Sequence, residues 1–439
     1  MEFFNREKEI ARLCEIRDFS ESNAQFTVIT GRRRIGKTQL ALKANEDMPM
    51  LYFFVARKAE FFLCQDFQQE ITEKLDIPIL GEIQSFGKLF EYLMILSKQR
   101  AFTLIIDEFQ EFYRVAPSVY SDIQRYWDLH SGKSKINLIV CGSVYSLMHK
   151  IFENKKEPLF GRMTANMSLK PFEVSVLKEM LGAHNPKYTA EDLLALYAFT
   201  GGVAKYVQLL MDNGASTYKK MLSFMIREDS IFINEGKNML IEEFGTEYAI
   251  YFTILSAIAR GENTRAKIEV VVNKEIGGYL TKLEHDYGLI SKTLPLFSKV
   301  ETKNVRYVLD DNFLIFWFRF IYKYGYMLEV GNYEGLRTII ERDYKTFSGL
   351  ILEKYFRMKF IQTQNITNIG SYWDRKGENE IDLIVVNEFD KEVQFIEVKR
   401  NVENISIELL KMKAAHFLST AHQLNNYRIT YSGLSLNEV

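Results

Sequence analysis

Apolar and polar positions follow two different rhythms along the front third of the chain. Short apolar runs at 26–30, 50–56, 102–107 and 136–141 are separated by stretches in which apolar residues recur every three or four positions. Such short runs fit strands buried on both faces, and the longer spacing fits amphipathic helices. Strands that alternate with helices build a parallel sheet, so the pattern predicts an α/β domain over residues 1–165.

The remainder of the chain changes its pattern twice more. Helical periodicity dominates residues 166–240, which predicts a helical lid after the sheet. Residues 241–312 predict three helices and a hairpin, which is the order of a winged-helix domain. Residues 313–439 predict a long helix followed by short strands, and therefore a second α/β domain.

Composition indicates a soluble globular protein. The chain has 439 residues, of which 47 % are hydrophobic and 26 % charged, and its net charge is −1. Because no chain-wide positive field exists, any surface that binds nucleic acid must be local. The longest apolar run, at 313–322, is too short to span a membrane and contains Arg319.

The cysteines and the N-terminus indicate the compartment. Cys14, Cys64 and Cys141 are scattered and provide neither a disulfide framework nor the spacing of a metal site. Charged residues occur from the second position onward within the first ten residues, unlike a signal peptide. We therefore expect a cytoplasmic protein without a membrane partner.

The first candidate site directly follows the strand at 26–30. Its sequence, GRRRIGKT at 31–38, fits the G-x-x-x-x-G-K-T phosphate-binding loop and leads into a helical segment. In such a loop the backbone N–H groups point at phosphates, Lys37 reaches the β- and γ-phosphates, and the Thr38 hydroxyl holds Mg²⁺. A glycine-rich turn without a ligand is the alternative. The predicted ATP-binding loop comprises Gly31, Arg32, Arg33, Arg34, Ile35, Gly36, Lys37, Thr38 and Gln39.

Two further strands end in polar residues. The apolar run at 102–107 ends in Asp107 and Glu108, and the run at 136–141 is followed by Ser143. We expect Asp107 to hold Mg²⁺ directly or through water, and Glu108 to polarise the water that attacks ATP. An acidic turn at a strand end is the alternative.

Together these motifs resemble the prokaryotic, archaeal-type ATPase family of the AAA+/STAND class. The resemblance implies that Arg6 approaches the adenine, that Ser143 senses the γ-phosphate, and that Arg162 or Lys205 supplies charge to it. A structural cation is the alternative for the last two. Ala204 departs from the proline that is common in relatives. The matching segments are FFNREKEIARL (3–13), GRRRIGKT (31–38), LIIDEFQ (104–110), GS (142–143), PLFGR (158–162) and TGGVAKY (200–206).

The hairpin EIDLIVVNEFDKEVQFIEVKR at 380–400 places Asp382, Glu397 and Lys399 inside predicted strands. Burying such charges is costly unless they are paired or bind a metal. Residues two apart share a face of a strand, so these three side chains can converge, and Glu353 lies on the helix upstream. Carboxylates suit Mg²⁺, and a lysine can orient a water or balance phosphate charge.

This constellation resembles the PD-(D/E)XK restriction-endonuclease-like fold. Many ATPases of the same family end in a W-x-x-x-G-x-E-I-D segment followed by E-x-K, and WDRKGENEIDLI at 373–384 matches it with one extra residue. The resemblance implies a Mg²⁺ site made by Glu353, Asp382 and Glu397, with Lys399 beside it. A solvated hairpin with cross-strand ion pairs is the alternative. A nuclease-like fold can also serve binding alone.

A simple NTPase with no role on DNA remains open at this point, and so do two functions of different classes. One is an ATPase that acts on DNA through a Mg²⁺-dependent nuclease-like domain. The other is a nucleotide-dependent switch whose tail binds a partner without cleaving it. Residues 265–309 hold eight basic and five acidic residues, an excess that suits weak phosphate contacts or a solvated face. ATP and Mg²⁺ are the expected cofactors, and DNA, a second copy of the chain or another protein is the open choice of partner.

Overall fold

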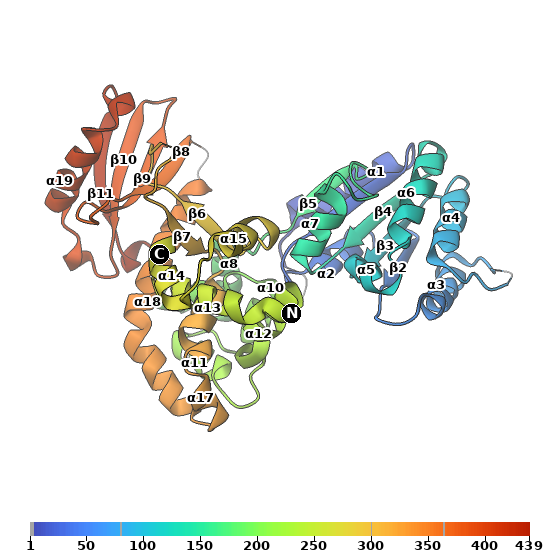
Figure 1. Ribbon diagram of the computed structural model, residues 1–439, viewed down its shortest axis with the longest axis horizontal. Coiled ribbons are helices and arrows are strands. Elements are labelled where there is room, and N and C mark those ends of the chain that lie inside the picture. The colour runs from blue at the N-terminus through green and yellow to red at the C-terminus, as the bar shows by residue number, and fades with distance from the viewer. Residues whose placement is uncertain (1–3, 80, 300, 363–364) are drawn as a thin grey trace. The chain divides into compact units, whose positions relative to one another are not determined.

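The computed structural model describes residues 4–79, 81–299, 301–362 and 365–439, which form two compact units (Figure 1). The first unit ends at Lys170, and the remainder of the chain makes the second. Each unit has a β-sheet and a hydrophobic core of its own.

A five-stranded sheet forms the centre of the first unit. Neighbouring strands all run parallel, and every residue of β3 and β4, two of the three inner strands, is buried. The predicted parallel α/β sheet is therefore confirmed, and the carboxyl ends of its strands lie at one edge. The strands, in spatial order, are β2 (Met50–Phe54), β3 (Phe102–Asp107), β4 (Ile136–Cys141), β1 (Gln25–Thr30) and β5 (Ala165–Ser168).

Helices cover both faces of this sheet, which explains why its inner strands are mostly apolar. On one face, α1 (Glu7–Ser20) and α2 (Lys37–Lys43) pack against Ile29, Ile105 and Ile139. A larger apolar cluster fills the other face. Its helices are α3 (Glu60–Leu75), α4 (Phe86–Leu96), α6 (Val119–His130) and α7 (Tyr145–Glu153), and a single turn, α5 (Phe112–Val115), follows β3.

The sheet extends one strand further than the sequence predicted. The predicted domain ended at 165, whereas β5 begins there and pairs with β1 from Thr27 to Thr30. β5 has the short sequence ANMS, in which Asn166 and Ser168 are exposed, so it lacks the apolar run that marks the inner strands. Short edge strands with polar outer residues are common in sheets.

Helices make up the first part of the second unit. α9 is buried from Asp192 to Thr200, and its first turn is closed by a capping box between Thr189 and Asp192. These helices occupy the segment predicted as a helical lid. They are α8 (Val174–His184), α9 (Ala190–Thr200), α10 (Ala204–Asp212), α11 (Tyr218–Met225) and α12 (Ile231–Phe244).

Three helices and a hairpin follow in the predicted order. The two strands of the hairpin pair antiparallel, with Ile290 opposite Leu309. The elements are α13 (Tyr248–Ala259), α14 (Arg265–Val272), α15 (Gly277–Thr281), β6 (Ile290–Thr293) and β7 (Arg306–Leu309).

The next helices pack against the helical segment and do not open a separate domain at 313, where the sequence placed one. Phe316 lies 4.7 Å from Phe199 of α9, measured between ring centres, and the Trp317 indole donates to the carbonyl of Ile233 on α12 at 2.9 Å. The aromatic run at 313–322 is thus a core element of one unit that reaches the end of the chain. The helices are α16 (Asn312–Phe316), α17 (Gly325–Glu329) and α18 (Tyr333–Ile361).

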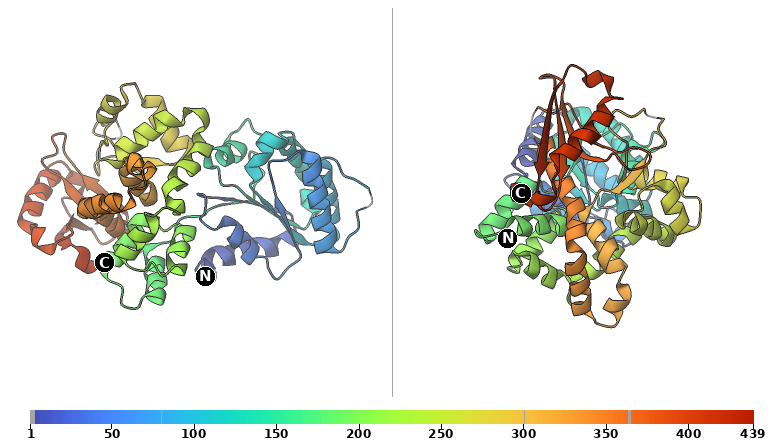
Figure 2. Two further views of the ribbon diagram at one scale, coloured as in Figure 1. Left: turned by 90° about the horizontal axis from the view of Figure 1, so that it is seen from below. Right: turned by 90° about the vertical axis from the view of Figure 1, so that its left-hand side faces the viewer.

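A four-stranded sheet completes the second unit. Its spatial order is β11-β10-β9-β8, in which β9 is antiparallel to both neighbours and β11 is parallel to β10. α19 connects β10 to β11 and packs along the sheet through Leu410, Ala414 and Phe417 (Figure 2). α18 contacts β9 and β10. The elements are β8 (Asn368–Tyr372), β9 (Ile381–Asn387), β10 (Glu392–Val398), α19 (Ile407–Leu418) and β11 (Arg428–Leu434).

Candidate functional site

The predicted phosphate-binding loop connects β1 to α2. Its backbone has positive φ at Gly31 (145°), Arg34 (66°) and Gly36 (97°). A Cβ on Gly31 would lie 2.6 Å from the carbonyl oxygen of Leu169, so this position requires glycine. The lysine of the loop folds back over it, since Lys37 Nζ donates to the carbonyls of Gly31 and Arg32, both at 2.9 Å.

Lys37 is 7 % exposed. Burial lowers the pKa of its ammonium group, and the nearby carboxylates of Glu108 and Asp107 oppose that shift. The loop thus holds a cation that is removed from water and bound only to neutral carbonyl oxygens. Such an ammonium group is poised to exchange these weak partners for phosphate oxygens.

The carboxylate of Asp107 meets the loop at the carboxyl end of β3. Its Oδ2 accepts hydrogen bonds from Thr38 Oγ1 at 2.7 Å and from the Tyr52 hydroxyl at 3.0 Å. Its Oδ1 accepts the backbone N–H of Glu108 at 2.9 Å. A hydroxyl and a carboxylate in contact are the hard oxygen donors that Mg²⁺ prefers, so Thr38 and Asp107 suit a Mg²⁺ ion bound with a nucleotide.

Glu108 lies beside this pair in a left-handed conformation, with φ of 52°. Its Oε2 accepts the Ser143 hydroxyl at 2.7 Å and also the side-chain amide of Gln110. The candidate base and the candidate γ-phosphate sensor are therefore in direct contact. Parallel strands bring them together, because β3 and β4 are neighbours with their carboxyl ends aligned.

The other residues predicted to bind the nucleotide differ in their burial and in their partners. Arg6 is buried, pairs with Glu9 at 2.8 Å and donates to the carbonyl of Lys170 at 2.6 Å. Arg32, Arg33 and Arg34 are half-buried, Ile35 is in the core and Gln39 is exposed. Arg162 pairs with Asp128 on α6 at 3.1 Å instead of meeting the loop, and Lys205 is an exposed residue of the second unit.

A second set of charged residues converges in the C-terminal sheet. Lys399 Nζ lies 3.1 Å from Asp382 Oδ2 on β9 and 3.2 Å from Glu397 Oε1 on β10. Asp382 Oδ2 also accepts the backbone N–H of Val398 at 2.8 Å. Glu397 is 5 % exposed, and its Oε2 has no hydrogen-bond partner within the described ranges. We call Asp382, Glu397, Lys399 and the nearby Glu353 the carboxylate cluster.

The carboxyl group of Glu353 on α18 interacts electrostatically with Asp382 and Lys399 of this cluster. Burial raises the pKa of the Glu353 carboxyl to about 8, and the Asp382 carboxylate adds to the shift while Lys399 opposes it. Burial acts to lower the pKa of Lys399, but Asp382 and Glu397 outweigh it, so that the pKa is raised. Among the residues that the structure describes, no three His, Cys, Asp or Glu side chains are grouped as a ready ligand set for one metal ion.

Sequence reasoning missed two side chains that touch these sites. Tyr52 supplies a hydroxyl to Asp107, and burial followed by the Asp107 charge raises its pKa. Arg306 of the β6–β7 hairpin forms two bonds with the Glu380 carboxylate, at 2.6 Å and 3.2 Å, and its guanidinium lies 4.4 Å from the centre of the Trp373 ring. Neither had a sequence signal, because the Tyr52 contact depends on β2 lying beside β3 and the Arg306 contact joins the hairpin to a different sheet.

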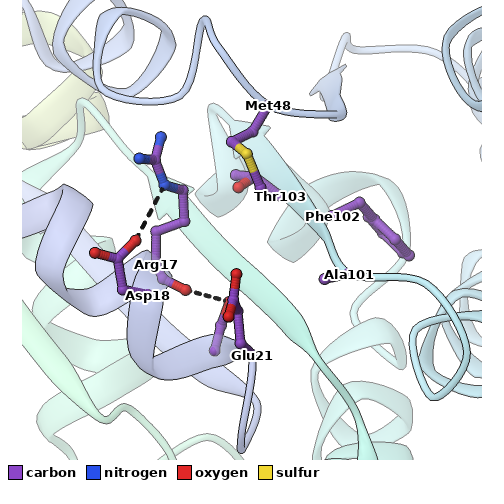
Figure 3. Close-up of a pocket in the computed structure, with 8 residues that line it drawn as sticks. Arg17, Asp18, Glu21, Met48, Ala101, Phe102 and Thr103 are labelled. Carbon is purple, nitrogen blue, oxygen red and sulfur yellow. Dashed lines mark hydrogen bonds and ion pairs between the residues drawn. The ribbon is translucent and has the colours of Figure 1, made fainter.

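A small pocket lies away from both sites, at the amino end of β3 (Figure 3). Met48, Ala101, Phe102 and Thr103 form part of its wall. On the charged side of the pocket, Arg17 forms ion pairs with Asp47 at 2.7 Å and with Asp18 at 3.8 Å. We assign it no role. Over the described part of the chain, no helix combines the length and the apolar character needed to cross a membrane.

The sequence and the fold both match known ATPases. Residues 3–210 match the family described as an ATPase domain predominantly from Archaea, and residues 317–412 match a family of archaeal and bacterial proteins of unknown function. An uncharacterized protein of Methanocaldococcus jannaschii is 31 % identical over 409 residues, which is 90 % of this chain and 87 % of the relative.

Among solved structures, a Walker-type ATPase of Pyrococcus abyssi has a similar fold, with a TM-score of 0.54 and 20 % identity. The match covers 72 % of this chain and 96 % of that one. The family match supports ATP binding and hydrolysis, for which Mg²⁺ is the usual metal. The chain belongs to the archaeal-type family of P-loop ATPases.

Proposed function

We propose that the first unit hydrolyses ATP with the residues gathered at the carboxyl edge of its sheet. Lys37 binds the β- and γ-phosphates once it leaves the carbonyls of Gly31 and Arg32. Thr38 and Asp107 hold Mg²⁺, which neutralises phosphate charge when bound. Glu108 takes the proton of the attacking water. Ser143 donates a hydrogen bond to Glu108 and senses whether the γ-phosphate is present.

Other cations complete the proposed nucleotide site. Arg6 is assigned to the adenine end, and the loop residues Gly31 to Gln39 contribute their backbone to the phosphates. Arg162 or Lys205 is proposed to supply charge to the γ-phosphate. Arg162 would have to exchange its bond to Asp128 for this role.

We further propose that the carboxylate cluster binds a divalent metal and acts on the phosphodiester backbone of DNA. The observation that carries this proposal is the buried Glu397, because its Oε2 lacks a partner in the described ranges while Oε1 faces Lys399. A buried carboxylate oxygen without a partner is costly, and a bound cation would compensate it. Mg²⁺ needs only one or two carboxylates besides water.

The residues of the cluster have separable roles in this proposal. Asp382 and Glu397 would hold the metal, and Glu353 on α18 would join them as a third ligand once it had lost its proton. A metal held there stabilises charge on the scissile phosphate and makes bound water more acidic. Lys399 orients the attacking water or balances the negative charge of the phosphate. The restriction-endonuclease-like fold proposed for the C-terminal sheet agrees with the order of these residues along the chain.

The segment 241–312 is proposed to be a winged-helix domain on the basis of its element order. Several of its cations offer little free charge to DNA, because they form ion pairs with acids. Arg265 pairs with Glu269 at 2.7 Å, and Lys267 lies 3.8 Å from Glu262. We therefore assign contact with DNA to the carboxylate cluster and not to this segment.

Cleavage of labelled DNA tests the proposal. The full chain is incubated with single-stranded, duplex and branched DNA in Mg²⁺, in Mn²⁺ or in a chelator. Glu397→Gln should abolish cleavage that depends on metal. The matched control is Glu392→Gln on the same strand, whose carboxylate pairs at the surface with Arg428 at 3.3 Å, and it should cleave normally. Equal cleavage by wild type and Glu397→Gln would refute the assignment, and no cleavage by wild type would favour a nucleotide-dependent switch with a binding tail.

A further inference from the structure

Arg400 connects the end of β10 to two helices of the same unit. It directly follows Lys399, and its Nη1 donates to Ser348 Oγ on α18 at 2.5 Å. Its Nη2 pairs with Glu191 in the first turn of α9. The guanidinium also lies 5.5 Å from the centre of the Tyr344 ring, and the side chain is 16 % exposed. A half-buried charged group next to the cluster is thus held from several sides.

The backbone at this point is fixed as well. The N–H of Lys399 donates to the carbonyl of Leu434 at 3.0 Å, and the carbonyl of Arg400 accepts the N–H of Leu436 at 3.4 Å. Lys399 has a long flexible side chain, and holding it in one conformation costs entropy. An anchored backbone on its C-terminal side limits where its ammonium group can lie.

A second polar connection joins the same helix, α9, to the other side of the cluster. Lys354 follows Glu353 on α18, and its Nζ donates to the carbonyl of Leu309 at 2.7 Å and to Asn312 Oδ1 at 3.4 Å. Asn312 in turn donates to the carbonyl of Tyr197 on α9 at 3.4 Å. Both Lys399 and Glu353 therefore have a sequence neighbour that is tied to α9.

Stability alone gives no reason for the Arg400–Glu191 pair. The cost of removing two charges from water cancels much of their attraction, and apolar residues of similar size often serve a buried position equally well. A guanidinium that contacts two partners through different nitrogens instead fixes the orientation of its side chain, because the group is planar and its N–H bonds point in defined directions. Such a contact is suited to hold a neighbouring residue in place.

We propose that Arg400 is a positioning residue, which with Glu191 and Ser348 holds Lys399 between Asp382 and Glu397. The inference rests on the function proposed for the cluster. Partners that orient metal-site residues typically change affinity or activity by 10- to 100-fold when they are removed. Removing either Arg400 or Glu191 should therefore weaken catalysis without removing any residue that touches metal or DNA.

The test compares Arg400→Gln, Glu191→Gln and the double variant in the full chain. Each single variant should lower kcat for metal-dependent cleavage by about 10-fold or more, with KM for DNA little changed. The double variant should be no worse than the worse single variant, because the two residues act through one contact. Arg400→Lys keeps the charge and can still reach one partner, so it should restore part of the activity. Arg337→Gln is the control, since Arg337 on α18 is also an arginine that donates to a distant partner in the same unit, the carbonyl of Ile226 at 2.7 Å.

A Mn²⁺ titration of the same variants without nucleotide provides a second readout, in an Asp107→Asn background that removes a proposed metal ligand of the nucleotide site. The inference is overturned if Asp382→Ala abolishes metal binding and cleavage while folded Arg400→Gln and Glu191→Gln match the wild type in both. It is also overturned if Arg337→Gln lowers kcat as much as they do. Absence of Asp382-dependent metal binding and cleavage in the wild type would defeat the proposed function, and this inference with it.

Discussion

The two candidate sites both place a lysine beside carboxylates at a strand end, yet the lysines have different partners. Lys37 donates to two backbone carbonyls and leaves Asp107 to the hydroxyls of Thr38 and Tyr52. Lys399 instead pairs with both carboxylates of its cluster. Burial lowers the pKa of Lys37, whereas the paired carboxylates raise the pKa of Lys399.

The different partners of the two lysines indicate which kind of ligand each site can bind. A cation bound only to neutral oxygens is available to an anion, and this is what a phosphate-binding loop requires. In the second site one lysine faces two carboxylates, and Glu353, with a pKa of about 8, is mostly protonated at neutral pH. That cluster retains one negative charge, which favours a cation. The following changes test whether this contrast holds, from the largest expected effect to the smallest.

Glu108→Gln should cause the largest loss and confine it to ATP turnover. A general base contributes about 100-fold or more to a rate, so phosphate release should fall by at least that factor. ATP affinity, measured with a fluorescent analogue, should stay near the wild-type value, because Glu108 contacts Ser143 and Gln110 and not the loop. Turnover within twofold of wild type would show that Glu108 is not the base.

Gly31→Ala should disturb the loop more than the same change at a turn of the C-terminal sheet. The new Cβ would lie 2.6 Å from the carbonyl oxygen of Leu169, so we expect a loss of about 2 kcal/mol or more in unfolding free energy, with weaker ATP binding. The control is Gly377→Ala, which also has positive φ but has open space around it and should cost about 1 kcal/mol. Chemical denaturation checks both. Equal losses would remove the case for a close contact at Gly31.

Glu353→Gln should change how stability depends on pH. The folded-state pKa of about 8 lies above the ordinary value of 4.5, so the folded state keeps its proton while the unfolded state loses it. Between these values the unfolding free energy of the wild type should fall as pH rises, by about 1–3 kcal/mol, and Glu353→Gln should lack that part of the fall. Urea denaturation in a chelator at several pH values measures it. Superimposable pH curves would contradict the burial of this carboxyl.

Tyr52→Phe should have the smallest effect. It removes one of three donors to Asp107 and leaves those of Thr38 and Glu108, so the Mg²⁺ concentration for half-maximal ATP turnover should rise by about three- to tenfold. Tyr113→Phe is the control, since its hydroxyl accepts a bond from Lys150 at the surface. An unchanged Mg²⁺ requirement would leave Tyr52 without a role in the site.

The nucleotide site could be predicted because its residues form a contiguous pattern followed by one strand end. Thr38 contacts Asp107, since the carboxyl ends of parallel strands share an edge, and Lys37 lies in the same loop as Thr38. Tyr52 could not be predicted, because its contact depends on β2 lying beside β3, and the order of strands in space is not written in local periodicity. The polar edge strand β5 was missed for lack of an apolar run.

The carboxylate cluster was predictable for a different reason, namely that charged residues inside apolar strands need partners. The sequence could not show that Arg400 reaches Glu191, a residue 209 positions away. It also could not place the aromatic run at 313–322, because helical periodicity predicts a buried face without saying which helices cover it. The helices of 312–361 pack against the preceding helices, and α18 also contacts β9 and β10, so they belong to one unit with both.

The central claim is that the two units carry two separate chemistries. Its most direct test is to measure ATP turnover and metal-dependent DNA cleavage in parallel for the wild type, Lys37→Ala and Asp382→Ala. We predict that Lys37→Ala loses ATP turnover, and that Asp382→Ala loses cleavage while it keeps ATP turnover at the wild-type rate. Cleavage that persists in Asp382→Ala, or ATP turnover without cleavage of any DNA by the wild type, would contradict the claim.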